Sequence, residues 1–255
     1  MAGERVVLLG QDGASTALLY HALAKAFETY VVLEEGPSTW ALLRSRMRRL
    51  GVMRVFGQVL FQVFVAVPLG ALSKSRRQAI ISESGISGAP IPENVISRVS
   101  TVNGTACWET VRALSPEVVC INGTRILSAK TIAALQRPIL NTHVGMTPRY
   151  RGVHGAYWAL VNNDHEHCGV TVHLVDEGVD TGGVLYQGTI EPTANDNFTT
   201  YPTLQMARGS ALLVSAVHTA LRGELKVIQG PAGDKRWYHP TLWQYLFYRI
   251  TRGVK

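Results

Sequence analysis

The stretch from Pro138 to Gly183, PILNTHVGMTPRYRGVHGAYWALVNNDHEHCGVTVHLVDEGVDTGG, decides the fold that we expect for this chain. Its apolar run PIL leads into Asn-Thr-His as a β-strand would, and strand alternation places Asn141 and His143 on one face. A second apolar segment, GVTVHLV, runs into an acidic, glycine-containing turn. If the sheet is parallel, Asp180 of that turn returns to the same strand ends. The pattern therefore predicts that an amide, an imidazole and a carboxylate meet in one site.

Outward from this stretch, apolar runs alternate with helical segments, which is the signature of an α/β fold. We expect strands at 5–9, 29–33, 95–99, 117–121, 138–141, 169–174 and 184–190. Helices are expected over 199–222 and from about Pro240 onward. The predicted fold class is α/β, with a Rossmann-like, mostly parallel sheet and helices on both faces. We expect a catalytic core over 1–198, with an insertion at about 40–90, and a C-terminal helical extension over 199–255 packed on it.

The composition is that of a globular protein: 46% of the 255 residues are hydrophobic and 17% are charged, which excludes a disordered chain. A net charge of +7 favours anionic partners such as nucleotides, phosphates, folate carboxylates, nucleic acid or acidic lipid. The three cysteines are widely spaced and lack a C-x-x-C pair, so neither a disulfide framework nor a zinc site is indicated. With no signal-like start, we expect a reduced, cytoplasmic protein.

Residues 55–72 form a nearly continuous apolar run with arginines and lysines on both sides. Gln58, Gln62 and Pro68 interrupt it, and it is shorter than the roughly 20 residues that span a bilayer core. We expect a buried or dimer-forming helix with basic ends. A peripheral contact with anionic lipid remains the alternative, because interfacial helices have the same pattern.

The first loop, GQDGAST, has Gly10, Gly13 and Ser15 at the expected start of a helix, where free N–H groups attract phosphate. Its glycine spacing does not fit the dinucleotide fingerprint. The loop is either a tight turn without a ligand or a site for a substrate phosphate rather than for NAD.

The predicted trio of Asn141, His143 and Asp180 has the groups that acyl transfer to an amine requires. The Asn141 amide can donate to a carbonyl oxygen as that oxygen gains negative charge. His143 can accept a proton from an amine or, as imidazolium, stabilise the oxyanion, and Asp180 would orient it. Together they suit acyl transfer to an amine without a serine or cysteine nucleophile and without a metal. Taken singly, each residue has an ordinary structural explanation, and His154 fits packing at a helix start better than catalysis.

Three segments carry a family resemblance: NGTRILS (122–128), LNTHVGMTPRYRGVHGAYWAL (140–160) and GVTVHLVDEGVDTGGVLYQ (169–187). They resemble the folate-dependent formyltransferases, a family that includes glycinamide ribonucleotide transformylase, the catalytic domain of methionyl-tRNA formyltransferase and the sugar-nucleotide N-formyltransferases. The resemblance implies a formyltransferase-type fold and formyl transfer from 10-formyltetrahydrofolate to a primary amine. It puts Asn141, His143 and Asp180 at the family's catalytic positions.

The resemblance also implies a folate pocket in which the TRIL segment contributes mainly backbone groups. The residues expected to bind the cofactor are Arg125, Ile126, Leu127, Val175, Asp176 and Val179. The residues expected to bind the acceptor substrate are Gly10, Gly13 and Ser15 of the first loop, with Tyr150 and Arg151 of the Tyr-Arg-Gly motif.

The acceptor expected from these features is the amine of a nucleotide-linked amino sugar, used for surface polysaccharides such as lipopolysaccharide. Only 65 residues follow Ile190, too few for the tRNA-binding barrel of methionyl-tRNA formyltransferases, so we expect no nucleic-acid partner. Trp237, Tyr238 and Trp243 are candidates for stacking on a base or sugar, although core packing is the commoner use. A homodimer is expected. The alternatives are a glycinamide ribonucleotide transformylase-like enzyme, a formyltetrahydrofolate hydrolase, and a non-catalytic folate- or membrane-binding relative.

Overall fold

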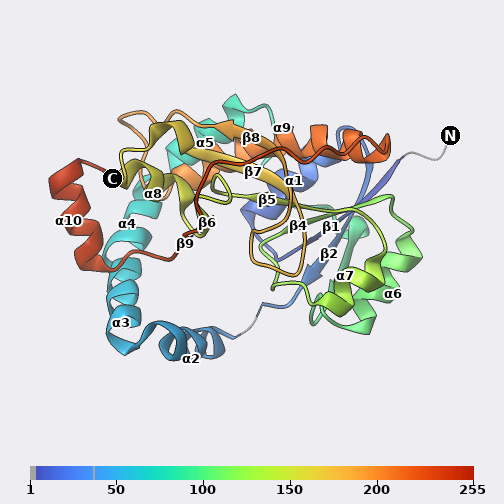
Figure 1. The fold of residues 1–255 in the computed structure, drawn as a ribbon, viewed down its shortest axis with the longest axis horizontal. Helices are drawn as coiled ribbons and strands as arrows, with labels where there is room; N and C mark the ends of the chain where they lie inside the picture. The colour runs from blue at the N-terminus through green and yellow to red at the C-terminus, as the bar shows by residue number, and fades with distance from the viewer. Residues whose placement is uncertain (1–3, 37) are drawn as a thin grey trace.

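A seven-stranded sheet forms the centre of the computed structural model, which describes residues 4–36 and 38–255 (Figure 1). In spatial order its strands are β3 (Ile96–Val99), β2 (Glu28–Glu34), β1 (Arg5–Gly10), β4 (Val118–Asn122), β5 (Ile139–His143), β7 (Gly169–Leu174) and β8 (Val184–Thr189). The first five are parallel, whereas β7 runs antiparallel to β5, and β8 antiparallel to β7. The predicted α/β class with a mostly parallel sheet is therefore confirmed.

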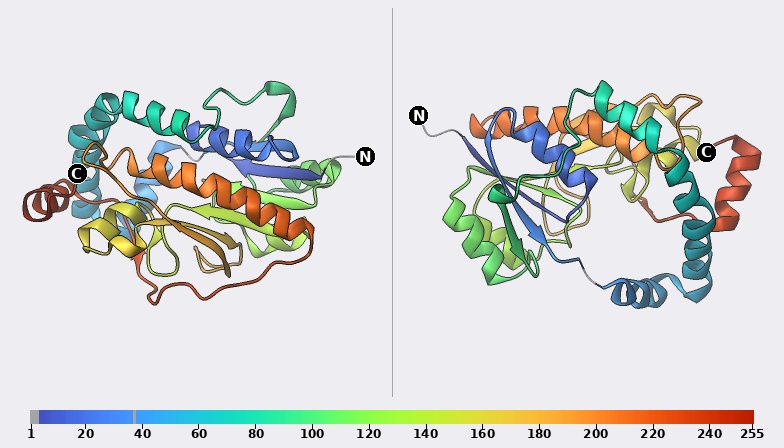
Figure 2. Two further views of the ribbon diagram at one scale, coloured as in Figure 1. Left: turned by 90° about the horizontal axis from the view of Figure 1, so that it is seen from above. Right: turned by 180° about the vertical axis from the view of Figure 1, so that it is seen from behind.

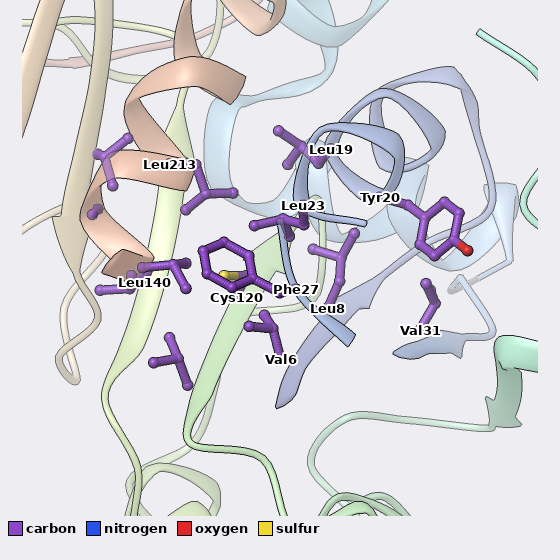
Figure 3. Packing of buried hydrophobic residues seen from close by; sticks show 14 of the residues in the cluster. Val6, Leu8, Leu19, Tyr20, Leu23, Phe27, Val31, Cys120, Leu140 and Leu213 are labelled. Atoms are coloured by element: carbon purple, nitrogen blue, oxygen red, sulfur yellow. The ribbon is translucent and has the colours of Figure 1, made fainter. Parts of the chain in front are cut away.

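Helices cover both faces of the sheet because its strands are apolar on both sides. In β1, Val6 and Leu8 join one core cluster, while Val7 and Leu9 join another on the opposite face. The first cluster lies under α1 (Ala14–Leu23), α5 (Lys74–Glu83) and α9 (Tyr201–Leu221), and the second under α6 (Thr105–Leu114) and α7 (Ala129–Leu135). Figure 3 shows the first cluster, with Leu213 of α9 beside the strand residues. Helix α9 thus packs on the sheet as predicted, and the division at residue 198 stays a prediction.

A third core cluster lies at the β5–β8 end of the molecule, where the Phe61 ring contacts Phe198 and Tyr245 at centroid distances of 4.8 and 5.1 Å. It joins α3 (Val52–Phe61), a π-helical segment η1 (Gln62–Ala66), α4 (Val67–Leu72), α8 (Gly155–Val161) and α10 (Leu242–Arg252). Short elements complete the chain: η2 (Glu93–Val95), η3 (His165–His167), and β6 (Arg151–Gly152) paired in parallel with β9 (Arg236–Trp237).

Residues 38–73 form a helical arm (Figure 2). Its first helix extends away from the sheet, and after a turn the following helical segments run back along the body of the molecule. The arm consists of α2 (Thr39–Leu50), which the Ser38 hydroxyl caps by accepting the Ala41 N–H at 3.3 Å, followed by α3, η1 and α4. The expected helix over 55–72 is present; it is mostly exposed rather than buried, and its role in a dimer stays a prediction. Val52–Leu72 is long and apolar enough to cross a membrane, yet only 22% of the residues in its most apolar 18-residue stretch are buried. The reason is that only one stripe of this helix meets the body.

Candidate active site at the end of strand β5

The centre of the candidate site is a buried pair of side chains, His143 and Asp180. Nδ1 of His143 lies 3.3 Å from Oδ1 of Asp180, and Nε2 of the same ring lies 3.0 Å from the carbonyl oxygen of Tyr150. A carbonyl oxygen can only accept, so Nε2 carries a proton, and Nδ1 faces a carboxylate that favours a second one. His143 is 6% exposed, so this geometry is shielded from bulk water.

The electrostatics of the pair favour the charged form of both groups. Burial opposes the imidazolium, but the hydrogen bond and charge of Asp180, with help from the Tyr150 carbonyl, outweigh it and raise the pKa of His143. Burial acts against the Asp180 carboxylate as well, and the contact with His143 nevertheless lowers its pKa to about 2. The pair therefore favours an imidazolium next to a carboxylate.

Asn141 occupies the same face of β5 as His143, as the strand alternation predicted, and a second histidine fixes its orientation. Nδ1 of His173 lies 2.6 Å from the Leu174 carbonyl oxygen and must carry the proton, which leaves Nε2 to accept from the Asn141 amide at 3.1 Å. Burial lowers the pKa of His173, so this ring is neutral. One amide N–H of Asn141 is thus used, and among the described residues the other has no acceptor, so it can donate to a ligand. The sequence pattern predicted no role for His173, although its place in the strand 169–174, which ends next to the acidic turn, was a usable signal.

Asp180 reaches His143 by a different route from the one that the sequence suggested. Because β7 runs antiparallel to β5, its last residue, Leu174, pairs with Leu140. The chain therefore leaves β7 near the start of β5, whereas His143 lies at the end of β5. The loop 175–183 folds back over the strand, with Asp180 in the left-handed region at φ 53°. The Asp176 carboxylate holds this loop internally, accepting the Gly178 N–H at 3.0 Å and the Thr181 hydroxyl at 2.6 Å. The trio meets as predicted, but the premise of parallel strands was wrong.

The Tyr-Arg-Gly segment links the parts of the site through its backbone and one side chain. The Tyr150 carbonyl accepts from His143, the Arg151 Nε donates to the Val179 carbonyl at 2.9 Å, and the Gly152 N–H donates to Oδ2 of Asp180 at 3.0 Å. The Tyr150 side chain is only 2% exposed and its hydroxyl donates to Asp164. Both residues hold other parts of the site in place, and neither is among the residues that line the cavity next to the trio, so their contact with substrate stays a prediction.

The trio opens onto a cavity of about 480 Å³. Six residues predicted to bind the cofactor all line it: Arg125, Ile126, Leu127, Val175, Asp176 and Val179. The Arg125 N–H is held by the Glu34 carboxylate, and the Ile126 carbonyl accepts from Asn103. Fewer backbone groups of the TRIL segment are therefore left for a ligand than the sequence suggested.

The first loop contributes less than expected. Ser15 lines the main cavity and its hydroxyl accepts from Asn122 at 2.9 Å, but Gly10 and Gly13 do not reach the cavity. A Cβ on Gly10 would lie 2.8 Å from a methyl group of Thr16, so close packing of α1 on β1 explains this glycine. Gly13 lines a separate depression next to residues 88–98. The expected phosphate site at these two glycines does not form part of the main cavity.

A second cavity of about 180 Å³ adjoins the first, sharing Gly152, Val153 and Arg236 with it. Arg46, Arg49 and Gln58 of the arm line its other side. Gln58 is 5% exposed; its amide N–H donates to the His239 carbonyl at 2.8 Å, while its Oε1 has no hydrogen-bond partner in the described structure. The second cavity therefore offers guanidinium groups and one free buried acceptor.

Of the aromatic residues expected to stack on a ligand, two are used in packing. Trp237 stacks on Tyr150 and Trp158 at centroid distances of 5.7 and 4.8 Å, and Trp243 lies against Gly57. Trp237 and Tyr238 both line the second cavity, and Arg54 lies 5.2 Å from the ring centroid of Tyr238. His154 packs on Phe198 at 4.3 Å, as predicted.

Relatives of this chain include methionyl-tRNA formyltransferases and a trifunctional purine biosynthetic protein. A methionyl-tRNA formyltransferase from Anaeromyxobacter dehalogenans is 32% identical over 125 residues, which cover 49% of this chain and 40% of that protein. The chain thus aligns with less than half the length of the curated relatives.

Solved structures share the fold. Glycinamide ribonucleotide transformylase 1 from Symbiobacterium toebii matches with a TM-score of 0.55 and 19% identity, covering 91% of this chain and 92% of that one. An N-formyltransferase from Helicobacter canadensis, solved with folinic acid and dTDP-3-aminofucose, matches with a TM-score of 0.53 and 13% identity, covering 91% and 70%.

The family model described as formyl transferase matches residues 74–217, which is more than half of the chain. This segment contains β3 to β8 and with them Asn141, His143 and Asp180. The chain belongs to the formyl transferase family.

Proposed function

We propose that this protein is an N-formyltransferase that moves the formyl group of 10-formyltetrahydrofolate to the primary amine of a nucleotide-linked amino sugar. The observation that carries the proposal is the buried His143–Asp180 pair next to Asn141 on the wall of the main cavity. Family membership supports the folate donor and the reaction type.

Each group of the trio has a role in the reaction. The amine nitrogen attacks the formyl carbon, and the formyl oxygen gains negative charge that the free N–H of Asn141 and the imidazolium of His143 stabilise. The bond between the formyl carbon and the folate nitrogen then breaks. The amine loses one proton and the leaving nitrogen gains one, and the adjacent His143–Asp180 pair is suited to carry it. The products are a formamide and tetrahydrofolate.

The six residues around the main cavity that are proposed to hold the folate fall in two groups. Arg125, Ile126 and Leu127 follow β4, and Val175, Asp176 and Val179 belong to the loop that carries Asp180. A pterin placed between them would set its formyl group beside the trio. Ser15 remains the one proposed acceptor contact in the first loop.

The second cavity supports a phosphorylated acceptor. Guanidinium groups are the side chains best suited to phosphate, and Arg236 lies where the two cavities meet. The free Oε1 of Gln58 requires a donor, such as a sugar hydroxyl. An amino sugar joined to a nucleotide by phosphates presents amine, hydroxyl and phosphate in one molecule. A cytoplasmic location and a role in surface polysaccharide synthesis are parts of this proposal.

The test is an assay of the full chain with 10-formyltetrahydrofolate and a panel of amines: nucleotide-linked amino sugars, the same amino sugars without a nucleotide, glycinamide ribonucleotide, and methionyl-tRNA. We expect tetrahydrofolate release together with a gain of formyl mass on a nucleotide-linked amino sugar. Formylation of glycinamide ribonucleotide alone would overturn the acceptor assignment. Release of formate without any amine would assign the site to a hydrolase, and absence of turnover with every amine would overturn the proposed activity.

A further inference from the structure

The exposed apolar side chains of this molecule are concentrated on two helical segments, the arm (38–73) and α10. Of the 17 large hydrophobic residues that are exposed in the described part of the chain, fourteen lie on these two segments. They include Met53, Phe56 and Phe64 on the arm and Phe247 and Ile250 on α10, with exposed fractions from 53% to 82%. Figure 1 shows the two segments next to each other at one end of the molecule. We call them together the arm surface.

The pattern within the arm distinguishes an interfacial helix from a spanning one. Val55, Gln58 and Phe61 face the body and are buried, whereas Val52, Phe56 and Val59 on the opposite side are exposed. Gly57 allows close contact with the Trp243 ring of α10, where a Cβ would overlap it. A helix with one side packed on a globular body cannot be surrounded by lipid, so its exposed stripe can only lie along an interface.

Positive charge is concentrated on the same segments. The arm contains five arginines, at 44, 46, 48, 49 and 54, and α10 contains Arg249 and Arg252, with no aspartate or glutamate in either segment. Since the whole chain has 25 basic and 18 acidic residues, the rest has 18 of each and no net charge. Arg44, Arg48 and Arg54 are exposed among the apolar side chains of the arm. The arm surface thus combines exposed apolar area with unopposed cationic groups.

These two properties decide between the candidate occupants. A symmetric dimer formed through the arm surface would place two arrays of arginines against each other without acidic partners, which opposes association. An anionic bilayer supplies both the apolar phase for the exposed stripe and the negative charge for the arginines. We propose that the arm surface is a docking site for anionic phospholipid membranes, by which this protein binds peripherally.

The docking goes beyond formyl transfer and does not depend on it, because the whole arm and all of α10 lie outside the residues that match the family model. The two features are nevertheless neighbours. Arg46, Arg49 and Gln58 of the arm line the second cavity, so the arm surface adjoins the proposed acceptor end of the site.

The test is co-sedimentation of the full chain with vesicles of phosphatidylcholine alone and vesicles in which about one third of the lipid is phosphatidylglycerol. We expect at least tenfold stronger binding to the anionic vesicles, weakened by salt. Phe64→Asp should reduce binding more than tenfold, and Arg48→Ala about fivefold, which is the usual effect of one basic residue near an anionic surface. Val227→Asp, which places the same charge at an exposed apolar residue outside the arm surface, should bind as the parent does.

Circular dichroism and formyl transfer by the Phe64→Asp variant should match the parent, because this side chain is 66% exposed and lies outside both cavities. Equal binding of Phe64→Asp and the parent would overturn the proposal, as would absence of binding to anionic vesicles. A dimer in light scattering that Phe64→Asp dissociates, without vesicle binding, would assign the surface to a second copy of the chain. Since vesicle binding needs no formyl donor, its failure is distinguishable from failure of the enzymatic assay.

Discussion

Two histidines at the candidate site have opposite pKa shifts because their ring nitrogens meet different groups. His143 faces a carboxylate and a carbonyl oxygen, both of which accept, and its pKa is raised. His173 donates to one carbonyl and accepts from the Asn141 amide, and burial lowers its pKa. The surroundings of the first ring therefore favour the imidazolium form, and the second ring orients the amide.

Replacing His143 by alanine should abolish most of the turnover and leave folate affinity within a few fold. The charge of the imidazolium is needed mainly when the formyl oxygen becomes negative, so the loss falls on kcat, by about 10² to 10⁴. The measurements are steady-state formyl transfer and equilibrium folate binding. His165→Ala, a change of an exposed histidine away from the main cavity, is the control and should keep parent activity. Near-full turnover of His143→Ala would refute the assignment.

The Asp180→Asn variant should shift the alkaline limit of activity to lower pH. Since the folded pKa of His143 is raised, the imidazolium is present below that pKa and is lost as pH rises through it. Without the carboxylate, burial and the loss of its charge lower the pKa, so activity disappears at lower pH. The profile of kcat/KM against pH measures this shift, and NMR titration of the ring checks it. An unchanged alkaline limb would show that another group sets it.

At the scale of elements, the site depends on a nine-residue loop, 175–183, that folds back over β5. It is held by the Arg151 side chain at the Val179 carbonyl and by the Gly152 N–H at Asp180. Glycine is needed at 152 because its φ is 94° and a Cβ would overlap the Trp237 carbonyl oxygen. The conformation of two connecting segments, rather than a strand, therefore places the carboxylate.

Gly182→Ala should impair catalysis by displacing this loop. A Cβ at 182 would overlap the Leu174 carbonyl oxygen, so the backbone carrying Asp180 must move. We expect kcat/KM to fall at least tenfold, since displacements of about 1 Å can cost 10²-fold, and stability to fall by about 1–3 kcal/mol. Kinetics and thermal unfolding measure the two effects. At Gly88 the nearest atom to an added Cβ is 3.4 Å away, so Gly88→Ala is the control. Parent kinetics in Gly182→Ala would show that the loop tolerates the shift.

At the scale of the whole molecule, the second cavity exists only because segments far apart in sequence meet. Arg46 and Arg49 come from α2, Gly152 from β6, and Arg236 from β9. Parallel pairing of β6 with β9 joins the last two, with Gly152 opposite Trp237. The arm lines the opposite side of this cavity through Arg46, Arg49 and Gln58.

Arg236→Ala should raise the KM for a phosphorylated acceptor by about ten- to a hundredfold, the usual effect of losing a hydrogen bond to a charged group. The KM for the folate donor should change little, and an acceptor without phosphate should be affected less. Lys235→Ala is the matched control, because this lysine stacks on Trp237 at 3.9 Å and lines neither cavity. Equal effects of the two variants would argue against a phosphate contact.

The sequence by itself determined the α/β class, the strand positions and the placement of Asn141 and His143 on one face. These follow from local rules: apolar periodicity sets strands and helices, and alternation puts residues 141 and 143 on one face. The six folate residues came from the family resemblance, and all of them line the main cavity.

Only the tertiary structure decided strand direction, loop path and exposure. The antiparallel placement of β7, the contact of Arg151 with the Val179 carbonyl and the hydrogen bond between His173 and Asn141 all join residues that are 20 or more positions apart. Exposure of the helix at 52–72 could not be predicted from its apolar composition, because a buried helix and an interfacial helix are equally apolar, and only packing against the rest of the chain distinguishes them.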